Sequence, residues 1–302
     1  MKASGLAGLS LAGVGVLSAN ANPDQLSDHN EYKGKSIKQK FNMCGYAAPK
    51  LETVRIGFVG LGNRGPDAVN RMSKIDGVSI KALCDIRPEK VNAVKKSLEA
   101  TSHNPDVYTG KQEEWKRMCD RPDIDLIYIA TPWSLHTPMA VYAMNQGKHV
   151  CIEVPAAKTI EECWQLVETS ESTKKHCIIL ENCCYDFFEL LTLNMQRQGL
   201  FGEIVHGEGA YNHDLLSLNF DKDGYYDMWR LKENFRNGNL YPTHGLGPVA
   251  QALDINRGDR MDYLVSTSTN DFSMSVKAKE LALKDEFYKE FASKSFRGNM
   301  NV

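Results

Sequence analysis

Three glycines in the first third of the chain have the spacing of a phosphate-binding turn. Gly60, Gly62 and Gly65 follow a run of β-branched and aromatic residues and precede a helix-like segment. In such a strand–turn–helix unit the first glycine permits the tight turn, and the second lets the backbone approach a pyrophosphate. The third brings the helix close to the strand, so that amides at the helix N-terminus face the phosphates. The pattern indicates a dinucleotide site only if its surroundings agree, because glycine-rich turns occur in many folds.

An aspartate at a second position supports this interpretation. Asp85 ends an apolar run 20 residues after Gly65 and precedes Pro88, which fits the first turn of a helix. A carboxylate there can accept hydrogen bonds from an adenosine ribose and would repel a 2′-phosphate. The combination favours NAD over NADP. In the alternative interpretation, Asp85 only caps the helix that begins near Pro88.

Polar residues also follow the later apolar runs. Thr131-Pro-Trp-Ser-Leu-His136 comes after one such run, Glu153-Val-Pro155 ends another, and Asn182 follows the last. Ligands of open parallel sheets bind outside the carboxyl ends of the strands, so these segments are expected to border the nicotinamide end of the cofactor. The plainer alternative is that Trp133 only packs and His136 only begins a helix.

The order of the apolar runs predicts the fold. Alternating strand-like and helix-like segments from Val54 to Leu180 indicate a parallel sheet with crossover helices. Strands are expected at 54–60, 78–84, 107–108, 126–130, 149–155 and 177–180, with helices after Gly65, at 89–99, up to about 145 and from Thr159. Beyond 183 we expect helices near 185–198, 241–253 and 277–291, strand-like stretches at 204–211 and 263–268, and loops with short turns over 212–240. The fold class is therefore α/β, a Rossmann-type parallel sheet domain followed by an incomplete α+β substrate domain with an open sheet.

Length and the N-terminal residues suggest the domain limits. A chain of 302 residues with ordinary composition suggests two domains, which we place at 51–182 (NAD-binding Rossmann domain) and 183–302 (partial substrate-binding domain). Residues 1–21 are interpreted as a signal segment and 22–50 as a linker. The apolar stretch Leu6–Leu17 is short for a membrane span, and Ala19-Asn20-Ala21 fits a cleavage site. Because Lys2 to Gly8 resembles the segment after the arginine pair of twin-arginine leaders, we expect export to the periplasm; a cytoplasmic protein with a disordered leader is the alternative.

Charge and cysteine usage exclude other classes. The net charge of −2 and the absence of aromatic–basic interleaving argue against a nucleic-acid partner. The eight cysteines (44, 84, 119, 151, 163, 177, 183 and 184) contain no C-x-x-C pair. We interpret them as buried small hydrophobes and expect neither a metal site nor a disulfide framework.

The motifs taken in order resemble those of a known superfamily. The chain resembles the Gfo/Idh/MocA family of sugar-handling, nicotinamide-dependent proteins in the order of its motifs: a glycine turn, Asp-Ile, T-P-x-x-x-H and E-x-P. Members of that family usually carry a catalytic lysine in E-K-P. Here Val154 stands at that position. Gly209-Ala-Tyr-Asn-His213, Met228-Trp-Arg230 and Tyr241-Pro-Thr-His244 extend the resemblance to glycoside hydrolase family 109, from about residue 54 to the chain end. That family is expected to carry E-V-P, so Val154 favours the hydrolase branch over a net dehydrogenase.

The resemblance implies two sets of site residues. The first would contact the cofactor, together with the three glycines: Asn63, Arg64, Asp85, Trp133, Ser134, Leu135, His136, Glu153, Val154 and Asn182. The second would contact the substrate: Tyr211, Arg230, Tyr241, Pro242, Thr243 and His244. Tyr211 could instead be a strand-face aromatic and Arg230 a solvated charge. For His213 the functional and the structural interpretations stay open.

The implied reaction is hydrolysis of a terminal α-N-acetylgalactosaminide without the usual two carboxylates, an exception known among NAD-dependent glycosidases. NAD⁺ would accept hydride from the sugar C3, a base would remove the acidified C2 proton, and the glycosidic oxygen would leave. Water would then add and the hydride would return. Tyr241 and His244 are the catalytic candidates for the proton transfers.

Two alternative functions remain open. One is a Gfo/Idh/MocA-type sugar oxidoreductase, and the other is an inactive, truncated NAD-binding remnant. Relatives are expected to run on past this point, with a further substrate-contacting tyrosine, and Asn299–Val302 resembles the start of a long strand. The partner would be a glycan ending in N-acetylgalactosamine; no membrane span is expected, and a homo-oligomer is compatible with the sequence.

Overall fold

The computed structural model describes residues 39, 41–268 and 270–299. Contacts divide the chain into residues 1–39 and residues 40–302. The predicted signal segment and residues 22–38 of the predicted linker lie outside the described residues. Residues 41–50 contain a turn but neither helix nor strand. In the described part of the chain, no helix is long and apolar enough to cross a membrane.

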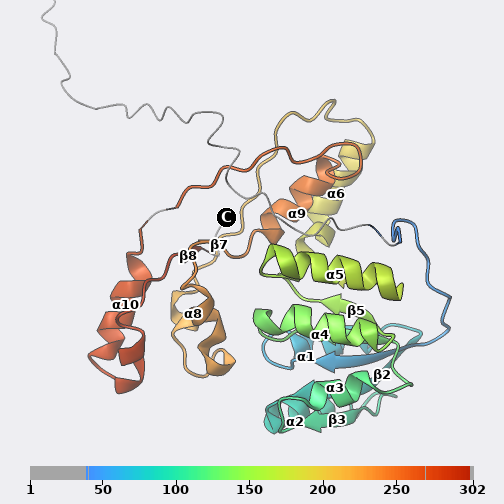
Figure 1. The fold of residues 1–302 in the computed structure, drawn as a ribbon, viewed down its shortest axis with the longest axis horizontal. Helices are drawn as coiled ribbons and strands as arrows, with labels where there is room; N and C mark the ends of the chain where they lie inside the picture. Colours follow the sequence, from blue (N-terminus) through green and yellow to red (C-terminus); the bar gives the residue numbers. More distant parts are fainter. Residues whose placement is uncertain (1–38, 40, 269, 300–302) are drawn as a thin grey trace, which may run out of the picture. The chain divides into compact units, whose positions relative to one another are not determined.

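Six parallel strands form the sheet that carries the site (Figure 1). They are β1 (Val54–Val59), β2 (Val78–Asp85), β3 (Asp106–Thr109), β4 (Leu126–Ile129), β5 (His149–Ile152) and β6 (Cys177–Ile179). Their order across the sheet is β3-β2-β1-β4-β5-β6. The strand order reverses between β1 and β4, and ligands of such sheets bind in the crevice at this point. The predicted Rossmann-type α/β fold is confirmed.

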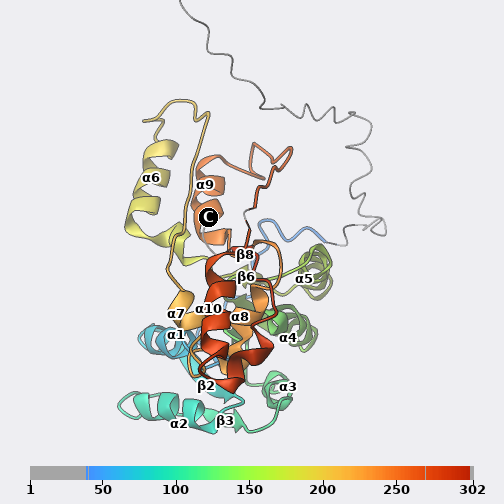
Figure 2. The same ribbon diagram turned by 90° about the vertical axis from the view of Figure 1, so that its left-hand side faces the viewer.

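Helices cover both faces of this sheet (Figure 2). Those on one face are α1 (Gly65–Met72) and α2 (Pro88–Ser97), and those on the other are α3 (Glu114–Cys119), α4 (Trp133–Asn145) and α5 (Ile160–Thr173). Each face has its own apolar core, one around Phe58 and Val91 and the other around Met118 and Met144. Because β1 and β4 are buried on both faces, they read as nearly continuous apolar runs.

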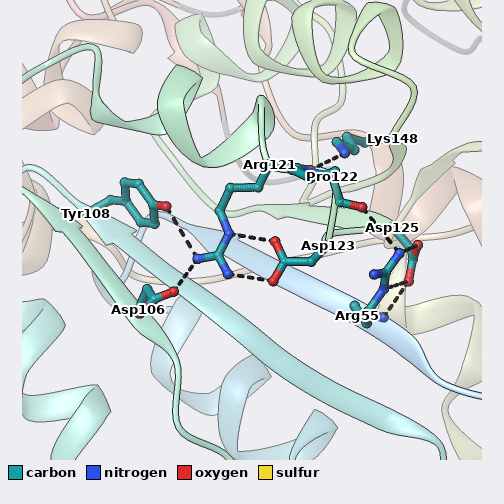
Figure 3. A network of polar contacts seen from close by, with 8 residues as sticks. All are labelled: Arg55, Asp106, Tyr108, Arg121, Pro122, Asp123, Asp125 and Lys148. Carbon is teal, nitrogen blue, oxygen red and sulfur yellow. Dashed lines mark hydrogen bonds and ion pairs between the residues drawn. The ribbon is translucent and has the colours of Figure 1, made fainter.

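Ion pairs join the strands at the amino end of the sheet (Figure 3). The Arg55 side chain donates from Nε to Asp125 Oδ2 at 2.8 Å, and the Arg55 backbone N–H donates to the same oxygen at 3.0 Å. Arg121 binds Asp123 through both carboxylate oxygens and also reaches Asp106 and Tyr108. Charged residues at this end therefore bind one another, and the opposite end of the sheet is left for a ligand cavity.

The chain after β6 is built mainly from helices. They are the 3₁₀ helix η2 (Asn182–Tyr185), α6 (Phe187–Arg197), α7 (Leu216–Asn219), η3 (Tyr226–Met228), α8 (Trp229–Glu233), α9 (Thr243–Ala252), α10 (Ser273–Ala282) and η4 (Glu286–Glu290). A small apolar core joins α7, α8, α10 and η4 around Leu231 and Phe291. Helices α6 and α9 lie side by side in both views (Figures 1 and 2). Within the described residues, strand pairing here consists of β7 (Gly238–Asn239) with β8 (Gly298–Asn299) and of an isolated bridge between Ile255 and Asp259.

Three expectations about this region were wrong. Residues 204–211 and 263–268 form no strand, because no neighbouring strand is present among the described residues to pair with them. The segment 204–211 instead passes α9, where a Cβ on Gly209 would lie 2.3 Å from the Gly245 carbonyl oxygen. The expected helix 277–291 is two helices, α10 and η4, because the extended Asp285 accepts a hydrogen bond from Phe287 N and starts a new turn. Residues 300–302 of the expected last strand lie outside the described residues.

The cysteines are less uniform than expected. Cys84, Cys119, Cys151 and Cys184 are buried, and Cys177 and Cys183 are partly buried. Cys44 and Cys163 are exposed, because the first precedes the sheet in a loop and the second lies in α5 away from its buried residues. All eight are free thiols.

Candidate functional site

A cavity of about 570 Å³ opens at the carboxyl ends of the central strands. The predicted site residues that line it are Gly60, Gly62, Asn63, Arg64, Asp85, Trp133, Leu135, His136, Glu153, Val154, Asn182, Tyr211, Arg230, Tyr241 and His244. Gly65, Ser134, Pro242 and Thr243 do not line it. Residues from both halves of the described chain therefore share one cavity at the reversal of strand order.

The glycine turn fits a close-packed phosphate cradle. Gly60 has φ +90°, and a Cβ on it would lie 2.4 Å from the Ala130 carbonyl oxygen, at the end of β4. A Cβ on Gly65 would lie 2.1 Å from the Gly60 carbonyl oxygen. At Gly62, by contrast, the only close neighbour of a Cβ in the described part of the chain is the end of the Arg87 side chain, at 3.4 Å. The backbone at Gly62 is thus accessible to a ligand, whereas Gly60 and Gly65 are fixed by packing, as a dinucleotide site requires.

Asp85 holds the turn in place. Its Oδ2 accepts a hydrogen bond from Leu61 N at 2.7 Å, and its Oδ1 accepts one from Arg87 N at 2.9 Å. The carboxylate therefore organises the backbone of the turn and also lines the cavity, while its contact with an adenosine ribose stays a prediction. Arg87, which the sequence analysis did not select, lines the same part of the cavity, and its guanidinium lies 5.6 Å from the Tyr226 ring centre. The sequence feature that could have identified Arg87 as a site residue is its position two residues after Asp85.

Glu153 is the centre of a hydrogen-bond network on the other side of the cavity. The Tyr128 hydroxyl donates to Glu153 Oε1 at 2.5 Å, and Arg64 Nε donates to the same oxygen at 3.1 Å. Arg64 also donates to Asn182 Oδ1 at 3.2 Å. Burial by itself would lower the pKa of Arg64, but the Glu153 carboxylate outweighs it and the pKa is raised. Three predicted cofactor residues from separate segments are thus joined directly.

His136 fixes two loops to each other. Its Nδ1 lies 2.7 Å from the Pro155 carbonyl oxygen, and its Nε2 lies 2.8 Å from the Thr131 carbonyl oxygen. Burial lowers the pKa of this imidazole, although both carbonyls act in the opposite direction. Each ring nitrogen faces a carbonyl oxygen, and a neutral imidazole can donate to one of the two. His136 shapes the cavity wall, and its contact with the cofactor stays a prediction.

Aromatic rings surround the Arg230 guanidinium. Trp133 stacks on Tyr241 with ring centres 5.6 Å apart, and the Arg230 guanidinium carbon lies 5.3 Å from the Tyr241 ring centre and 5.5 Å from that of Trp133. Arg230 also donates to the Tyr225 hydroxyl at 3.2 Å. Tyr225 and Trp229 were not predicted as site residues, although Trp229 stands in the motif Met228-Trp-Arg230. Such a cationic, aromatic-walled recess can bind polar ring compounds through hydrogen bonds and ring-face contacts.

The two predicted catalytic residues lie next to each other. The ring centres of Tyr241 and His244 are 4.8 Å apart, and those of Tyr211 and His244 are 4.3 Å apart. Burial raises the pKa of Tyr241 well above its usual value, so its hydroxyl stays protonated at neutral pH. Tyr211 also contacts His213, whose ring centre is 4.3 Å away, but His213 lines a second cavity of about 700 Å³.

A buried carboxylate that the sequence analysis did not select contacts His244. Glu181 Oε1 lies 2.5 Å from His244 Nδ1. In the sequence, the indication that Glu181 belongs to the site is modest. It is a charged residue directly after the apolar run of β6 and next to the predicted site residue Asn182.

Glu181, Cys183 and His244 are also the one group of possible metal donors found in the described part of the chain, with donor atoms within 4.8 Å of one another. Two ligands of a tetrahedral zinc ion stand roughly 3.3 Å apart, given metal–ligand distances near 2 Å. Glu181 Oε1 and His244 Nδ1 are closer than this and bind each other. Burial raises the pKa of Cys183 to about 11, which disfavours the thiolate that a metal requires. The expectation of no metal stays a prediction.

Two family models match the chain in succession. The model described as "Oxidoreductase family, NAD-binding Rossmann fold" matches residues 54–180, and the one described as "Glycosyl hydrolase 109, C-terminal domain" matches residues 185–290. The chain belongs to glycoside hydrolase family 109. The resemblance inferred from the motifs is confirmed.

Individual members of family 109 are similar over most of the chain. An alpha-N-acetylgalactosaminidase from Bacteroides fragilis is 53% identical over 266 residues, which cover 86% of this chain and 62% of that relative. A glycosyl hydrolase family 109 protein from Porphyromonas gingivalis is 56% identical over 241 residues, 79% of this chain and 51% of that relative. The chain thus spans between half and two thirds of the length of these family 109 proteins.

A solved structure agrees with the fold. Scyllo-inositol dehydrogenase from Lactobacillus casei with bound cofactor NAD(H) and scyllo-inositol matches with a TM-score of 0.54 and 21% identity, over 67% of this chain and 56% of that chain. At this identity the likeness concerns the fold alone. The family 109 chain therefore shares its backbone architecture with a dehydrogenase.

Proposed function

We propose that this chain carries the cofactor site and the proton-transfer residues of an NAD-dependent glycosidase that removes terminal α-N-acetylgalactosamine. One observation carries the proposal: Tyr241 and His244 share a single cavity with the glycine turn and Asp85. The name of the Bacteroides fragilis relative supports the sugar specificity. Because the chain spans 62% of that relative, activity and substrate are proposals for this chain.

The cavity suits NAD more than NADP. The N-terminus of α1 and the accessible backbone at Gly62 favour a pyrophosphate, and the Asp85 carboxylate disfavours a 2′-phosphate by charge repulsion. NAD supplies a hydride acceptor that can return the hydride within one turnover. Val154 occupies the position of the lysine in E-K-P. Among the described residues that line the cavity, the one lysine is Lys111, which follows β3. This arrangement supports the hydrolase over a net oxidoreductase.

The proton transfers would fall to the residues opposite the turn. His244 would take a proton from the sugar and return it, since a histidine acts as an acid or a base near neutral pH. Tyr241 would donate from its hydroxyl, which is protonated at neutral pH. Arg230 and Tyr211 would orient the sugar through their contacts with Tyr241 and His244. Contacts from Pro242 and Thr243 stay predictions.

The test is an assay of p-nitrophenyl α-N-acetylgalactosaminide with no added electron acceptor. Release of p-nitrophenol without net formation of NADH supports the glycosidase. Steady accumulation of NADH without p-nitrophenol would instead support the oxidoreductase. If neither product appears while NAD still raises the thermal transition, the chain binds the cofactor without turnover.

Export to the periplasm is a separate proposal. It rests on the small apolar stretch Leu6–Leu17 and on Ala19-Asn20-Ala21, which lie outside the described residues. Fractionation of cells that express the full chain tests it, and retention in the cytoplasm with the N-terminus intact would contradict it.

A further inference from the structure

Glu181 and His244 form a buried pair, and the proposed reaction assigns no role to its carboxylate. Glu181 directly precedes η2, and His244 lies in the first turn of α9, which packs against η2. The side chains of Glu181 and His244 are 8% and 5% exposed. Besides the contact with His244 Nδ1 at 2.5 Å, Glu181 Oε1 accepts a hydrogen bond from Cys183 N at 3.0 Å. Both contacts are thus made by Oε1, whereas Glu181 Oε2 is buried without a hydrogen-bond partner among the described residues.

The charge of Glu181 determines which nitrogen of His244 carries hydrogen. Burial by itself would raise the pKa of the Glu181 carboxyl, but the hydrogen bonds from His244 and from Cys183 N outweigh burial and lower it. At neutral pH the group is therefore a carboxylate, which can only accept hydrogen bonds. Nδ1 of His244 must then be the donor. In a neutral imidazole the other nitrogen, Nε2, is left as the acceptor.

The Nε2 atom is free to act in the cavity. No hydrogen bond to His244 Nε2 occurs among the described residues, and it is not among the buried atoms there that lack a partner. The ring lies against Tyr211 and Tyr241 and lines the cavity that contains the glycine turn. Other charged or titratable groups near this site are Arg64, Glu153, Cys183, Cys184, Asp186, Glu189 and Arg230. Among the described residues, only Glu181 forms an ion-pair contact with His244.

We propose that Glu181 is a positioning residue that fixes His244 in the Nδ1–H tautomer, so that Nε2 is the proton acceptor of the reaction. The proposal rests on the proposed function for its catalytic consequence, but the tautomer itself is a property of the folded chain. In a general base held by a carboxylate, the carboxylate orients the ring and stabilises the imidazolium without becoming protonated.

Glu181→Gln is the decisive variant. A carboxamide can donate to Nδ1 as well as accept from it, so the Nδ1–H form loses its preference. We expect the ¹⁵N chemical shifts of the His244 ring to indicate Nδ1–H in the wild-type chain and a population of Nε2–H in E181Q. The variant His244→Gln assigns the signals.

The chain offers a matched control. His206 and Glu208 form another histidine–glutamate pair, with Nε2 and Oε1 3.3 Å apart, but both side chains are largely exposed. We expect Glu208→Gln to leave the His244 signals and the turnover number unchanged. If E181Q does not fold, as judged by its thermal transition, Glu181→Asp keeps the carboxylate with a shorter reach and replaces it as the test of turnover.

Kinetics supply the second measurement. We expect E181Q to lower kcat by roughly 10²- to 10⁴-fold, the usual contribution of a positioned acid–base group, with little change in KM. E181D should recover part of kcat. If the wild-type chain has no glycosidase activity, the proposed function fails while the ring shifts still test the tautomer.

Three results would overturn the inference. One is an Nε2–H tautomer of His244 in the wild-type chain, and another is an unchanged tautomer in a folded E181Q. The third is a response of both ring nitrogens to added zinc that Cys183→Ser abolishes, which would assign the three side chains to a metal site instead.

Discussion

Asp125 and Asp67 each pair with an arginine, but only Asp125 is sheltered. The Asp125 side chain is 14% exposed and receives hydrogen bonds from Arg55 N and Nε, whereas the Asp67 side chain is 55% exposed. We expect Asp125→Asn to lower the free energy of unfolding by about 1.5–3 kcal/mol, as is usual for hydrogen bonds to charged groups. Asp67→Asn should change it by less than about 0.5 kcal/mol, since exposed ion pairs contribute little. Urea unfolding at pH 7 measures both.

The stabilisation that the Arg55–Asp125 pair contributes depends on pH. The hydrogen bond from Arg55 holds the pKa of Asp125 below its usual value, despite partial burial. A lowered pKa means that the stabilisation is complete above the usual aspartate pKa of about 3.9 and is lost as the pH falls through the lowered value. The difference between wild type and Asp125→Asn should therefore shrink on acidification below about pH 4. A difference that stays constant from pH 7 to pH 2.5 would contradict this assignment.

Single residues at the carboxyl ends of the strands were predictable, but their partners were not. The glycine turn and Asp85 are recognisable because local spacing fixes where they lie along a strand–turn–helix unit. The contact between Glu181 and His244 joins residues 63 positions apart and depends on how α9 packs against η2. No local pattern in the sequence contains that information. The same holds for the tyrosines beside Arg230, which lie in a region without regular periodicity.

The turn between β1 and α1 is the most constrained connection of the site. Gly60 combines φ +90° with a Cβ position 2.4 Å from the Ala130 carbonyl oxygen, whereas Gly110 has φ +82° with nothing within 4 Å of its Cβ position. Gly110→Ala should therefore cost only the backbone strain, about 1 kcal/mol. Gly60→Ala adds a clash with backbone that cannot move, so we expect a larger loss of stability and loss of NAD binding. Unfolding curves and a thermal-shift titration with NAD compare the two variants.

The crossing of residues 207–211 with α9 is a second constraint at the level of elements. A Cβ on Gly209 would lie 2.3 Å from the Gly245 carbonyl oxygen, while one on Gly207 would meet a side-chain methyl of Val249 at 3.0 Å. We expect Gly209→Ala to cost about 1–3 kcal/mol, as overpacking does, and to separate Tyr211 from His244. Gly207→Ala should cost less, because a side chain can rotate. Equal losses of stability in the two variants would show that this backbone contact is not important.

Strands were predictable from the sequence where burial and pairing with a neighbouring strand agree with the strand propensity of the residues. The strands of the parallel sheet are continuous apolar runs buried on both faces, and β4 and β5 were found within a few residues of their expected ends. Residues 204–211 and 263–268 have the composition of strands, but a strand requires a neighbour that the composition does not supply. In the described residues Val205, Tyr263 and Leu264 are exposed instead. Strand propensity thus failed where pairing was absent.

Across the whole molecule, the reactivity of each cysteine thiol should depend on how deeply that thiol is buried. Cys44 and Cys163 are exposed, whereas Cys84, Cys119, Cys151 and Cys184 are buried. Burial raises the pKa of Cys119 to about 12 and that of Cys151 to about 11, which removes the reactive thiolate at neutral pH. We expect iodoacetamide to modify Cys44 and Cys163 in the native chain and the buried four only in urea. Mass spectrometry of tryptic peptides measures this, and Cys44→Ser should remove one of the native labels.

The double contact of His136 has a consequence for how this chain moves. The buried His136 ring lies between the carbonyl oxygens of Thr131, just after β4, and of Pro155, so neither loop can leave its place without losing contact with the same side chain. The two loops should therefore open together and on one timescale. Their backbone amides should exchange with deuterium at matched rates, and His136→Ala should uncouple them. This part of the cavity wall would then open and close as one unit, held together by a single buried histidine side chain.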